Sequence, residues 1–376
     1  MKKKVLRIAT VPISLNLLLQ GQLRMLNEDY EMVAVSSPGK DLDEVGAREG
    51  VRTVAIRMER RISPIQDLKS LFALIKLIRK EKPWMVHTMT PKAGLLGMLA
   101  ARICGVPVRL HLFTGLVFPT STGLKRRLLM ATDKLTCACA TFINPEGEGV
   151  KRDLECFGIT HKELHIVGNG NINGIDMTYF DRTEEVMKKA ESIREKDCIT
   201  FCFVGRIVGD KGMNELAEAF ARLEKEFPSC RLLLVGDFEE KLDPVSPETK
   251  RMFLENSRVT FAGWQQDIRP YLAASDIFVF PSYREGFPNV VLQAGAMDLP
   301  SIVTDINGSS EIIRDGMNGV IIPPRDTEAL WKAMRNMLTD EAARRKMAAN
   351  ARNLIGSRYD RTFLWQELKK TYKSLE

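Results

Sequence analysis

The sequence holds 376 residues, more than a single hydrophobic core usually organises, and therefore predicts two domains. Its composition of 44% hydrophobic, 27% charged and 7% aromatic residues excludes a disordered chain, a collagen-like chain and a disulfide scaffold. The formal net charge is +7, but residues 1–180 hold 26 Lys and Arg against 17 Asp and Glu, so this half is expected to present a surface to an anionic partner.

Short apolar strands alternate with helices along the first half of the chain. Strands are predicted at 5–10, 32–36, 85–88 and 108–113, and helices at 15–26, 64–80 and 93–104. This alternation is typical of a parallel sheet whose crossover connections are right-handed.

A second set of alternations begins at residue 199. Strands are predicted at 200–204, 231–235, 259–262, 277–280 and 301–303, with a helix at 213–227 and an amphipathic helix at 358–376. We therefore divide the chain into a first domain (1–178), a charged linker (179–197), a second domain (198–355) and a C-terminal helix (356–376). The predicted fold class is α/β, with two Rossmann-like doubly wound domains facing across a cleft at the carboxyl ends of their strands, where such sheets bind ligands.

Cysteine usage and apolar runs set the expected compartment. The seven cysteines form no CxxC pair, and the four histidines do not complete a zinc set, so no structural metal is expected. Arg7 interrupts the apolar stretch after the basic start, and no run of about 18 uncharged apolar residues follows anywhere. These features predict a cytosolic protein with reduced thiols.

The first strand excludes the commonest nucleotide cofactors. A dinucleotide-binding fold needs GxGxxG directly after this strand, but here the first glycine is Gly21, and a P-loop is absent as well. Asp41 and Asp43 match a DxD metal motif, but they follow a Pro-Gly turn and indicate a solvated loop. We therefore expect neither a redox cofactor nor a catalytic metal.

A glycine-punctuated basic loop follows the predicted strand 200–204. It runs from Gly205 and Arg206 to Lys211 and Gly212, and a helix comes next. The glycines would let the backbone approach a diphosphate, and the two cations would offset its charge. The alternative is a solvated basic turn.

A second polar loop follows the predicted strand 277–280. Glu285 could accept hydrogen bonds from sugar hydroxyls, and Gln293, one helical turn further on, could bind a ribose. The backbone amides where the next helix begins would form an anion site. The alternative is that Glu285 only complements the helix dipole.

These two loops, together with other short motifs along the chain, resemble the family 4 glycosyltransferases of the GT-B fold. The resemblance spans nearly the whole chain, because several weak motifs occur in the family's order. They are His87 to Gly97, Thr114-Gly115, Asn173-Gly174 with Asp176, Gly205-Arg206, Lys211-Gly212, Val235 to Asp237, Phe261 to Trp264, and Glu285-Gly286-Phe287.

The resemblance implies roles for individual residues. Arg206 and Lys211 would hold the donor's diphosphate, and Glu285, the first glutamate of the family's E-x7-E motif, would contact the transferred sugar. The other residues that the resemblance places against substrate are Phe287, Pro288, Asn289, Val290 and Val291 at phosphate and sugar, Trp264 and Gln265 at the base, and Gly205, Thr114, Gly115 and Asn173.

Two positions depart from the family's pattern. Gln293 replaces the second glutamate of E-x7-E, and a neutral amide binds a ribose more weakly than a carboxylate. The family's active-site histidine falls on Thr114, and His111 lies three residues earlier, where a packed strand-end histidine is the alternative interpretation.

The implied reaction is transfer of a sugar, with retention, from a nucleotide-sugar such as a UDP-sugar to a polyprenyl-diphosphate-linked or glycan acceptor of surface polysaccharide (capsule or O-antigen). Because the nucleotide-sugar is a substrate, no cofactor is expected, and the resemblance implies a metal-independent hexosyltransferase. It also implies that the C-terminal helix crosses back to the first domain. A nucleotide-sugar 2-epimerase of the same fold and a non-catalytic sugar-nucleotide-binding subunit remain as alternatives.

Basic residues alternate with apolar ones at 60–82 and, most clearly, at 123–130. This pattern favours peripheral docking on anionic lipid at the inner face of the plasma membrane. The alternative is a core-facing helix with a solvated back. Nucleic acid is not expected as a partner, because no aromatic stacking platform accompanies the charge.

Overall fold

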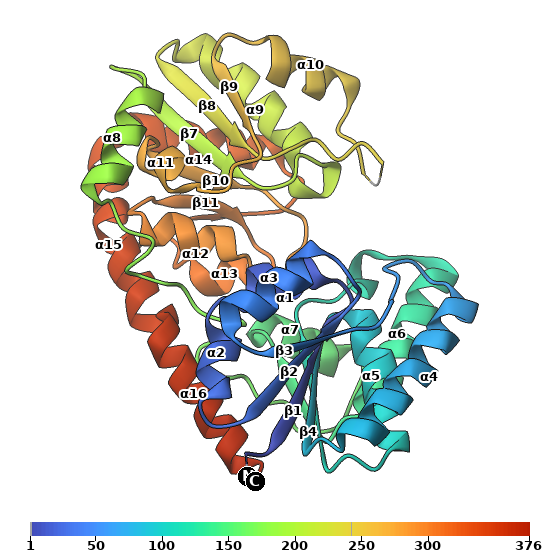
Figure 1. Ribbon diagram of the computed structural model, residues 1–376. Coiled ribbons are helices and arrows are strands. Elements are labelled where there is room, and N and C mark those ends of the chain that lie inside the picture. Colours follow the sequence, from blue (N-terminus) through green and yellow to red (C-terminus); the bar gives the residue numbers. More distant parts are fainter. Residues whose placement is uncertain (1, 242) are drawn as a thin grey trace. The chain divides into compact units, whose positions relative to one another are not determined.

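A computed structural model describes residues 2–241 and 243–376 (Figure 1). The chain divides into two compact units, unit 1 (Met1–Gly174 with Arg361–Glu376) and unit 2 (Ile175–Asp360). Each unit is built on a six-stranded sheet in which all the pairings are parallel. The predicted α/β class is confirmed.

The sheet of unit 1 has the strand order β3-β2-β1-β4-β5-β6. Its strands are β1 (Lys4–Ile8), β2 (Glu31–Ser36), β3 (Arg52–Ala55), β4 (Met85–Met89), β5 (Val108–Phe113) and β6 (Phe142–Pro145). Its helices are α1 (Pro12–Leu18), α2 (Gln22–Asn27), α3 (Lys40–Glu49), α4 (Pro64–Glu81), α5 (Pro91–Ile103), η1 (Phe118–Thr120), α6 (Gly123–Cys139), α7 (Glu148–Cys156) and α16 (Arg361–Ser374).

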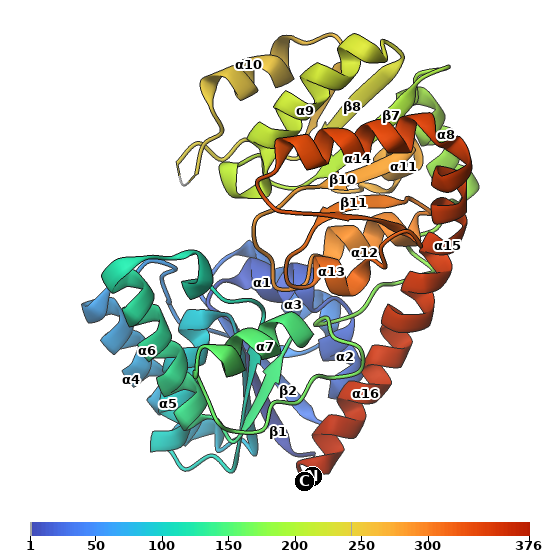
Figure 2. The ribbon, with the colours of Figure 1, turned by 180° about the vertical axis from the view of Figure 1, so that it is seen from behind.

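Helices cover both faces of this sheet (Figures 1 and 2). Buried residues of α4, α5, α6 and α7 join one apolar cluster, with Leu6 and Ile8 of β1. Buried residues of α1, α2, α3 and α16 join the other, with Val5 and Ala9. Since neighbouring side chains of a strand point to opposite faces, β1 serves both cores.

The helix predicted at 15–26 is two helices. Gly21 adopts φ +77° at the start of α2, a conformation that disfavours other residues. A Cβ at this position would lie 2.8 Å from the indole of Trp365, so α16 packs directly against the bend. The break therefore coincides with a glycine whose conformation and close contact both exclude a larger side chain.

The C-terminal helix also begins later than predicted. Helix α15 (Glu341–Tyr359) continues past residue 356, and the chain turns at Asp360 before α16 begins. Within unit 1, the Tyr372 hydroxyl lies 2.6 Å from His87 Nδ1 of β4, and Trp365 Nε1 donates to Asn173 Oδ1 over 2.7 Å. These two polar contacts, of which the first is buried, hold α16 on unit 1.

Asp41 and Asp43 do not lie in a loop, as the sequence had suggested, but in the first turn of α3. Carboxylates at this end of a helix are stabilised by its dipole. Asp41 also accepts a hydrogen bond from Asn16 Nδ2 over 2.8 Å. Their spacing therefore has a structural explanation.

Asp133, on the inner face of α6, predicts a pH-dependent stability. Burial raises the pKa of its carboxyl from 3.8 to about 7, so the folded protein binds more protons than the unfolded chain between about pH 4 and about pH 7. Stability from this group is then lost as pH rises through that window. Asp133→Asn is expected to remove the loss, and to raise the free energy of unfolding at the alkaline end by about 2–4 kcal/mol. Urea unfolding of both proteins at each end of the window checks this, and parallel pH profiles would contradict it.

The sheet of unit 2 has the strand order β12-β11-β10-β7-β8-β9. Its strands are β7 (Ile199–Val204), β8 (Cys230–Val235), β9 (Val259–Gly263), β10 (Ile277–Phe280), β11 (Ser301–Thr304) and β12 (Gly319–Ile322). Its helices are α8 (Glu184–Ile193), η2 (Gly209–Lys211), α9 (Met213–Glu226), α10 (Pro247–Glu255), α11 (Arg269–Ala273), α12 (Asn289–Ala296), α13 (Ser309–Ile312), α14 (Thr327–Thr339) and α15.

The segment predicted as a linker, 179–197, belongs to unit 2 and contains α8. The Thr183 hydroxyl caps this helix by accepting a hydrogen bond from Val186 N. Val186 and Ala190, four residues apart, share the buried face, which packs near α11. The high charge of the segment marks the solvated side of a helix. Among the residues that the structure describes, no helix is both long and apolar enough to span a membrane.

Candidate functional site

Three loops of unit 2 meet at the carboxyl edge of its sheet. The segments that follow β7 and β8 are in direct backbone contact, since Gly205 N donates to Val235 O over 2.9 Å. A Cβ on Gly236 would lie 1.9 Å from the Gly205 carbonyl oxygen, so only glycine allows this approach.

The loop after β10 joins the same edge. Tyr283 N donates to Asp210 O over 2.8 Å, which links this loop to the turn η2 that follows β7. Gly212 adopts φ +70°, and a Cβ there would lie 2.1 Å from the Pro281 carbonyl oxygen. The two loops that carry the predicted donor motifs are therefore in direct backbone contact.

This assembly brings Lys211 and Glu285 together as an ion pair. Ser282 Oγ donates a second hydrogen bond to the same carboxylate, over 2.9 Å, and the ammonium lies 5.1 Å from the ring centroid of Phe280. The side chains of Lys211 and Glu285 are only 14% and 18% exposed. In a partly desolvated site such a pair is stronger than at a surface, and it can rearrange when an anion arrives.

Two further arginines at this edge are also paired with carboxylates. Arg206 pairs with Glu239, which lies beyond the end of β8. Arg284 Nη2 lies 2.9 Å from Asp210 Oδ2. The cations that would meet a diphosphate are thus held in place, each neutralised by an acid of a neighbouring loop.

The segment 287–291 is anchored by its apolar side chains. Phe287 and Val291 are buried, and Phe287 contacts Tyr359 edge to face, with ring centroids 5.4 Å apart. The backbone at Gly308 packs closely against that of Gly286, because a Cβ on Gly308 would lie 2.5 Å from the Gly286 carbonyl oxygen. Pro288 is buried, whereas Asn289, Val290 and Gln293 are half-buried.

Helix α12 begins in this segment without a side-chain cap. The dipole of a helix favours an anionic group at its N-terminus. Gln293 lies one turn further along, and its side-chain amide has no hydrogen-bond partner among the described residues. The amide is thus available to a ligand.

The residues predicted at the nucleotide base follow β9. Trp264 N donates to Asp237 Oδ1 over 3.0 Å, and the indole is 68% exposed. Gln265 Nε2 donates to Ala262 O over 2.7 Å. Both therefore sit at the same edge of the sheet as the loops after β7, β8 and β10.

The predicted site residues of unit 1 have different surroundings. His111 is buried in β5, with Nδ1 2.7 Å from Thr88 Oγ1 and its ring edge to face with Phe113. Burial, and then the charge of Arg7, lower the pKa of His111 to about 3, so its imidazole is neutral. Gly94 of α5 packs directly over the ring.

Thr114 and Gly115 directly follow β5 and are half-buried at the carboxyl edge of the unit 1 sheet. Asn173 is buried, and its side chain bonds to Gln22, Trp365 and the Gln20 carbonyl. These contacts show a structural part for Asn173, while its contact with substrate stays a prediction.

Sequence reasoning missed Ser282, Asp210, Arg284 and Glu239 as site residues. Ser282 and Arg284 lie within the second polar loop and Asp210 within the first, so proximity to the motifs was the available signal. Glu239 gave no such signal, because its partner Arg206 is 33 positions away. Among the described residues, no group of three His, Cys, Asp or Glu side chains is arranged to hold a metal ion.

The chain matches two family models. The "Glycosyl transferase 4-like domain" covers residues 19–170, and "Glycosyl transferases group 1" covers residues 198–340. The capsular polysaccharide biosynthesis glycosyltransferase CapM of Staphylococcus aureus is 30% identical over 375 residues, 99% of this chain and 97% of that protein. An Escherichia coli relative, named UDP-Gal:alpha-D-GlcNAc-diphosphoundecaprenol alpha-1,3-galactosyltransferase, is 31% identical over 79% of this chain and 76% of its own length.

The fold is similar to a solved structure. HepE of Anabaena, determined in complex with UDP, superposes with a TM-score of 0.82 over the full length of both chains, at 18% identity. Together with the two family models and the full-length relative, this shows that the chain belongs to the family 4 glycosyltransferases with the GT-B fold and is similar in sequence to members that act in surface polysaccharide synthesis.

Proposed function

We propose that the chain transfers a hexosyl-type sugar from a UDP-sugar, with retention, to a polyprenyl-diphosphate-linked sugar during surface polysaccharide synthesis. The observation that carries the proposal is the Lys211–Glu285 pair at the carboxyl edge of the unit 2 sheet, where a diphosphate and the sugar attached to it would lie side by side. The name of the Escherichia coli relative specifies a UDP-sugar donor and a diphosphoundecaprenol-linked acceptor, which supports the same classes here.

The ion pairs suggest how the site would accept its donor. The incoming diphosphate would compete with Glu285 for Lys211 and with Glu239 for Arg206. The released Glu285 carboxylate would accept hydrogen bonds from sugar hydroxyls, with Ser282 holding one of its oxygens. Gln293 would bind the ribose. Each cation thus moves from a carboxylate to a phosphate without becoming unpaired.

Bond cleavage leaves negative charge on the nucleoside diphosphate. Lys211, Arg206 and the positive end of the α12 dipole would stabilise that charge, and preorganised electrostatic stabilisation of this kind is the largest contribution expected. These groups would supply the charge that Mg²⁺ supplies elsewhere, so we propose metal-independent transfer. The proposed route is front-face displacement, in which the departing phosphate takes the proton of the acceptor hydroxyl.

We propose that the enzyme acts at the inner face of the plasma membrane. A polyprenyl-linked acceptor is held in the bilayer, and residues 1–180 carry the excess of positive charge. Anionic lipid attracts such a surface by about 1 kcal/mol for each basic residue near it. The basic start of α6, with Lys125, Arg126 and Arg127, supports this location.

Donor binding can be tested by thermal unfolding with UDP, GDP and ADP in the presence of EDTA. UDP at 100 times its Kd is expected to stabilise the protein by about 2.7 kcal/mol, with smaller shifts for the other two nucleotides. Lys211→Ala should lose the shift. Lys250→Ala, which removes another glutamate-paired lysine of unit 2, should keep it. A UDP shift that survives in Lys211→Ala, or one that EDTA abolishes, would contradict the proposed site.

A further inference from the structure

Helix α4 carries apolar side chains on two opposite faces. Its inner face buries Leu74, Leu77 and Ile78 against the sheet. Its outer face carries the α4 stripe, which we define as Ile65, Leu68 and Phe72, exposed by 76%, 53% and 62%. The spacing of three and four residues aligns these side chains along one line of the helix. A solvated helix face is normally polar, so the stripe needs a partner.

Helix α6 repeats this arrangement. Its inner face buries Asp133, Thr136 and Cys137. Its outer face carries the α6 stripe, defined as Leu124, Leu128 and Leu135, exposed by 82%, 48% and 43%. Residues four and seven apart lie on one helix face, so this stripe is also continuous.

The two helices belong to one layer of unit 1. Helix α5 contacts both α4 and α6, and Figures 1 and 2 show the three on the same face of the sheet. Helices α4 and α6 follow β3 and β5, so each begins at the carboxyl edge of the sheet. Ile65 and Leu124, the most exposed members, therefore lie near that edge.

Basic side chains surround both stripes. The exposed cations on and before the two helices include Arg60, Arg61, Lys69, Lys76, Arg79, Lys80, Lys125, Arg127 and Lys134.

The acids of the two helices are engaged elsewhere. Asp67 pairs with Lys92 over 2.6 Å, Glu81 pairs with Lys4 and Arg52, and Asp133 is buried. The outer faces of α4 and α6 are therefore apolar and positively charged, with no exposed acid among the described residues.

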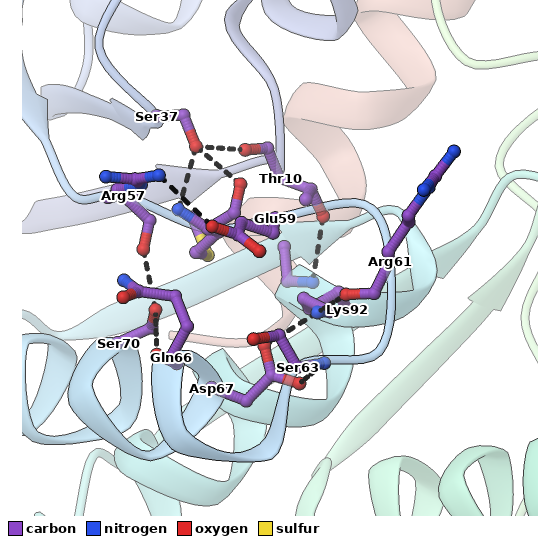
Figure 3. A network of polar contacts seen from close by, with 12 residues as sticks. Thr10, Ser37, Arg57, Glu59, Arg61, Ser63, Gln66, Asp67, Ser70 and Lys92 are labelled. Atoms are coloured by element: carbon purple, nitrogen blue, oxygen red, sulfur yellow. Dashed lines mark hydrogen bonds and ion pairs between the residues drawn. The ribbon is translucent and has the colours of Figure 1, made fainter.

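The loop that precedes α4 is fixed in place (Figure 3). Ser37 Oγ donates to Met58 O over 2.7 Å, Ser70 Oγ donates to Arg57 O over 2.6 Å, and Lys92 Nζ donates to Arg61 O. The Arg61 side chain points away from this network. Because the backbone is held, the loop presents Arg61 at little further cost in conformational entropy.

We propose that the α4 and α6 stripes together form a docking surface that inserts apolar side chains into an anionic lipid bilayer, with the surrounding cations on the headgroups. The inference rests on the proposed membrane-borne acceptor and specifies how the enzyme reaches it. A second copy of the chain fits poorly, because a symmetric interface would place the same basic residues opposite one another. An anionic bilayer satisfies both the apolar and the positively charged groups.

The test is cosedimentation with phosphatidylcholine vesicles that contain or lack phosphatidylglycerol, and no acceptor. The wild type is expected to bind the anionic vesicles more strongly. Ile65→Ser with Phe72→Ser, and separately Leu124→Ser with Leu128→Ser, should each weaken binding about tenfold. Lys69→Gln with Lys76→Gln should weaken it about fivefold per residue at low salt. The control is Leu17→Ser with Leu254→Ser, apolar residues that are 60% and 52% exposed on α1 and α10, outside the layer of α4 to α6, which should leave binding unchanged.

Three outcomes would overturn the proposal. They are equal binding to both kinds of vesicle, stripe variants that bind like the control, and a stripe-dependent dimer in sedimentation velocity without lipid. Unchanged melting temperatures would show that the variants remain folded. UDP stabilisation, measured on the same proteins, depends on unit 2 and is expected to persist in every variant, so failure of the docking surface is distinguishable from failure of the proposed transfer.

Discussion

Lys211→Ala is expected to lower kcat/KM for sugar transfer by about 10²- to 10³-fold. The substitution removes a cation from the leaving diphosphate, and it also leaves the Glu285 carboxylate without its ion-pair partner. That carboxylate, still held by Ser282, would then repel the phosphate. The loss should appear in kcat as well as in KM, because charge on the diphosphate grows as the glycosidic bond breaks.

Two variants distinguish this account from a general loss of structure. Lys250→Ala should transfer sugar at the wild-type rate, because Lys250 lies in α10 and its partner Glu240 has no proposed contact with the donor. Lys211→Ala with Glu285→Gln should bind UDP better than Lys211→Ala alone, since the repelling charge is gone. Wild-type kcat/KM in Lys211→Ala would contradict the assignment of the diphosphate site.

Gly212→Ala should destabilise unit 2 by about 3 kcal/mol or more, whereas Gly316→Ala should cost only about 1 kcal/mol. The two glycines have almost the same φ, +70° and +71°, so the conformational strain of an alanine is matched. They differ in space, because a Cβ on Gly212 would lie 2.1 Å from the Pro281 carbonyl oxygen, and a Cβ on Gly316 meets nothing within 4 Å. The difference between the variants isolates the contact between the two site loops.

Urea unfolding of both variants measures this difference, and UDP binding reports its consequence. Gly212→Ala should push the loop of Lys211 away from that of Glu285, so it should also lose UDP stabilisation. Gly316→Ala should keep it. Equal stability of the two variants would show that the loops can separate freely, and the site would then not depend on their contact.

The central strands of both sheets could be predicted because they are buried on both faces and appear as continuous apolar runs. Strands β3, β6 and β12 were missed. Each has only four residues and lies at an edge of its sheet, and β3 is largely exposed. Local sequence carries little signal for such strands, since their pairing is decided by the neighbouring strand.

Other differences arose from contacts between distant residues. Trp365 packs against the bend at Gly21, and within residues 15–26 only the glycine itself signalled that the helix would break. The high charge of segment 179–197 predicted a linker, although the spacing of Val186 and Ala190 indicates a helix with one buried face. Periodicity is the better guide in such a segment, because charge describes only the solvated side.

The motifs predicted the principal site residues but not their partners. Arg206, Lys211 and Glu285 stand out as charged residues in glycine-containing loops. That Lys211 binds Glu285 and Arg206 binds Glu239 follows from the strand order, which places β7 between β8 and β10. The sequence alone did not supply this order, so the ion-paired state of the site is a finding of the structure.

The most direct test of the central claim is transfer of labelled sugar from a panel of UDP-sugars to a polyprenyl-diphosphate-linked acceptor. The account predicts that label enters the lipid fraction only when acceptor is present, with the wild type and Lys250→Ala, and not with Lys211→Ala. Conversion of the nucleotide-sugar without acceptor would identify an epimerase instead. Nucleotide binding without any turnover, across the whole panel, would indicate a non-catalytic binding subunit and contradict the account.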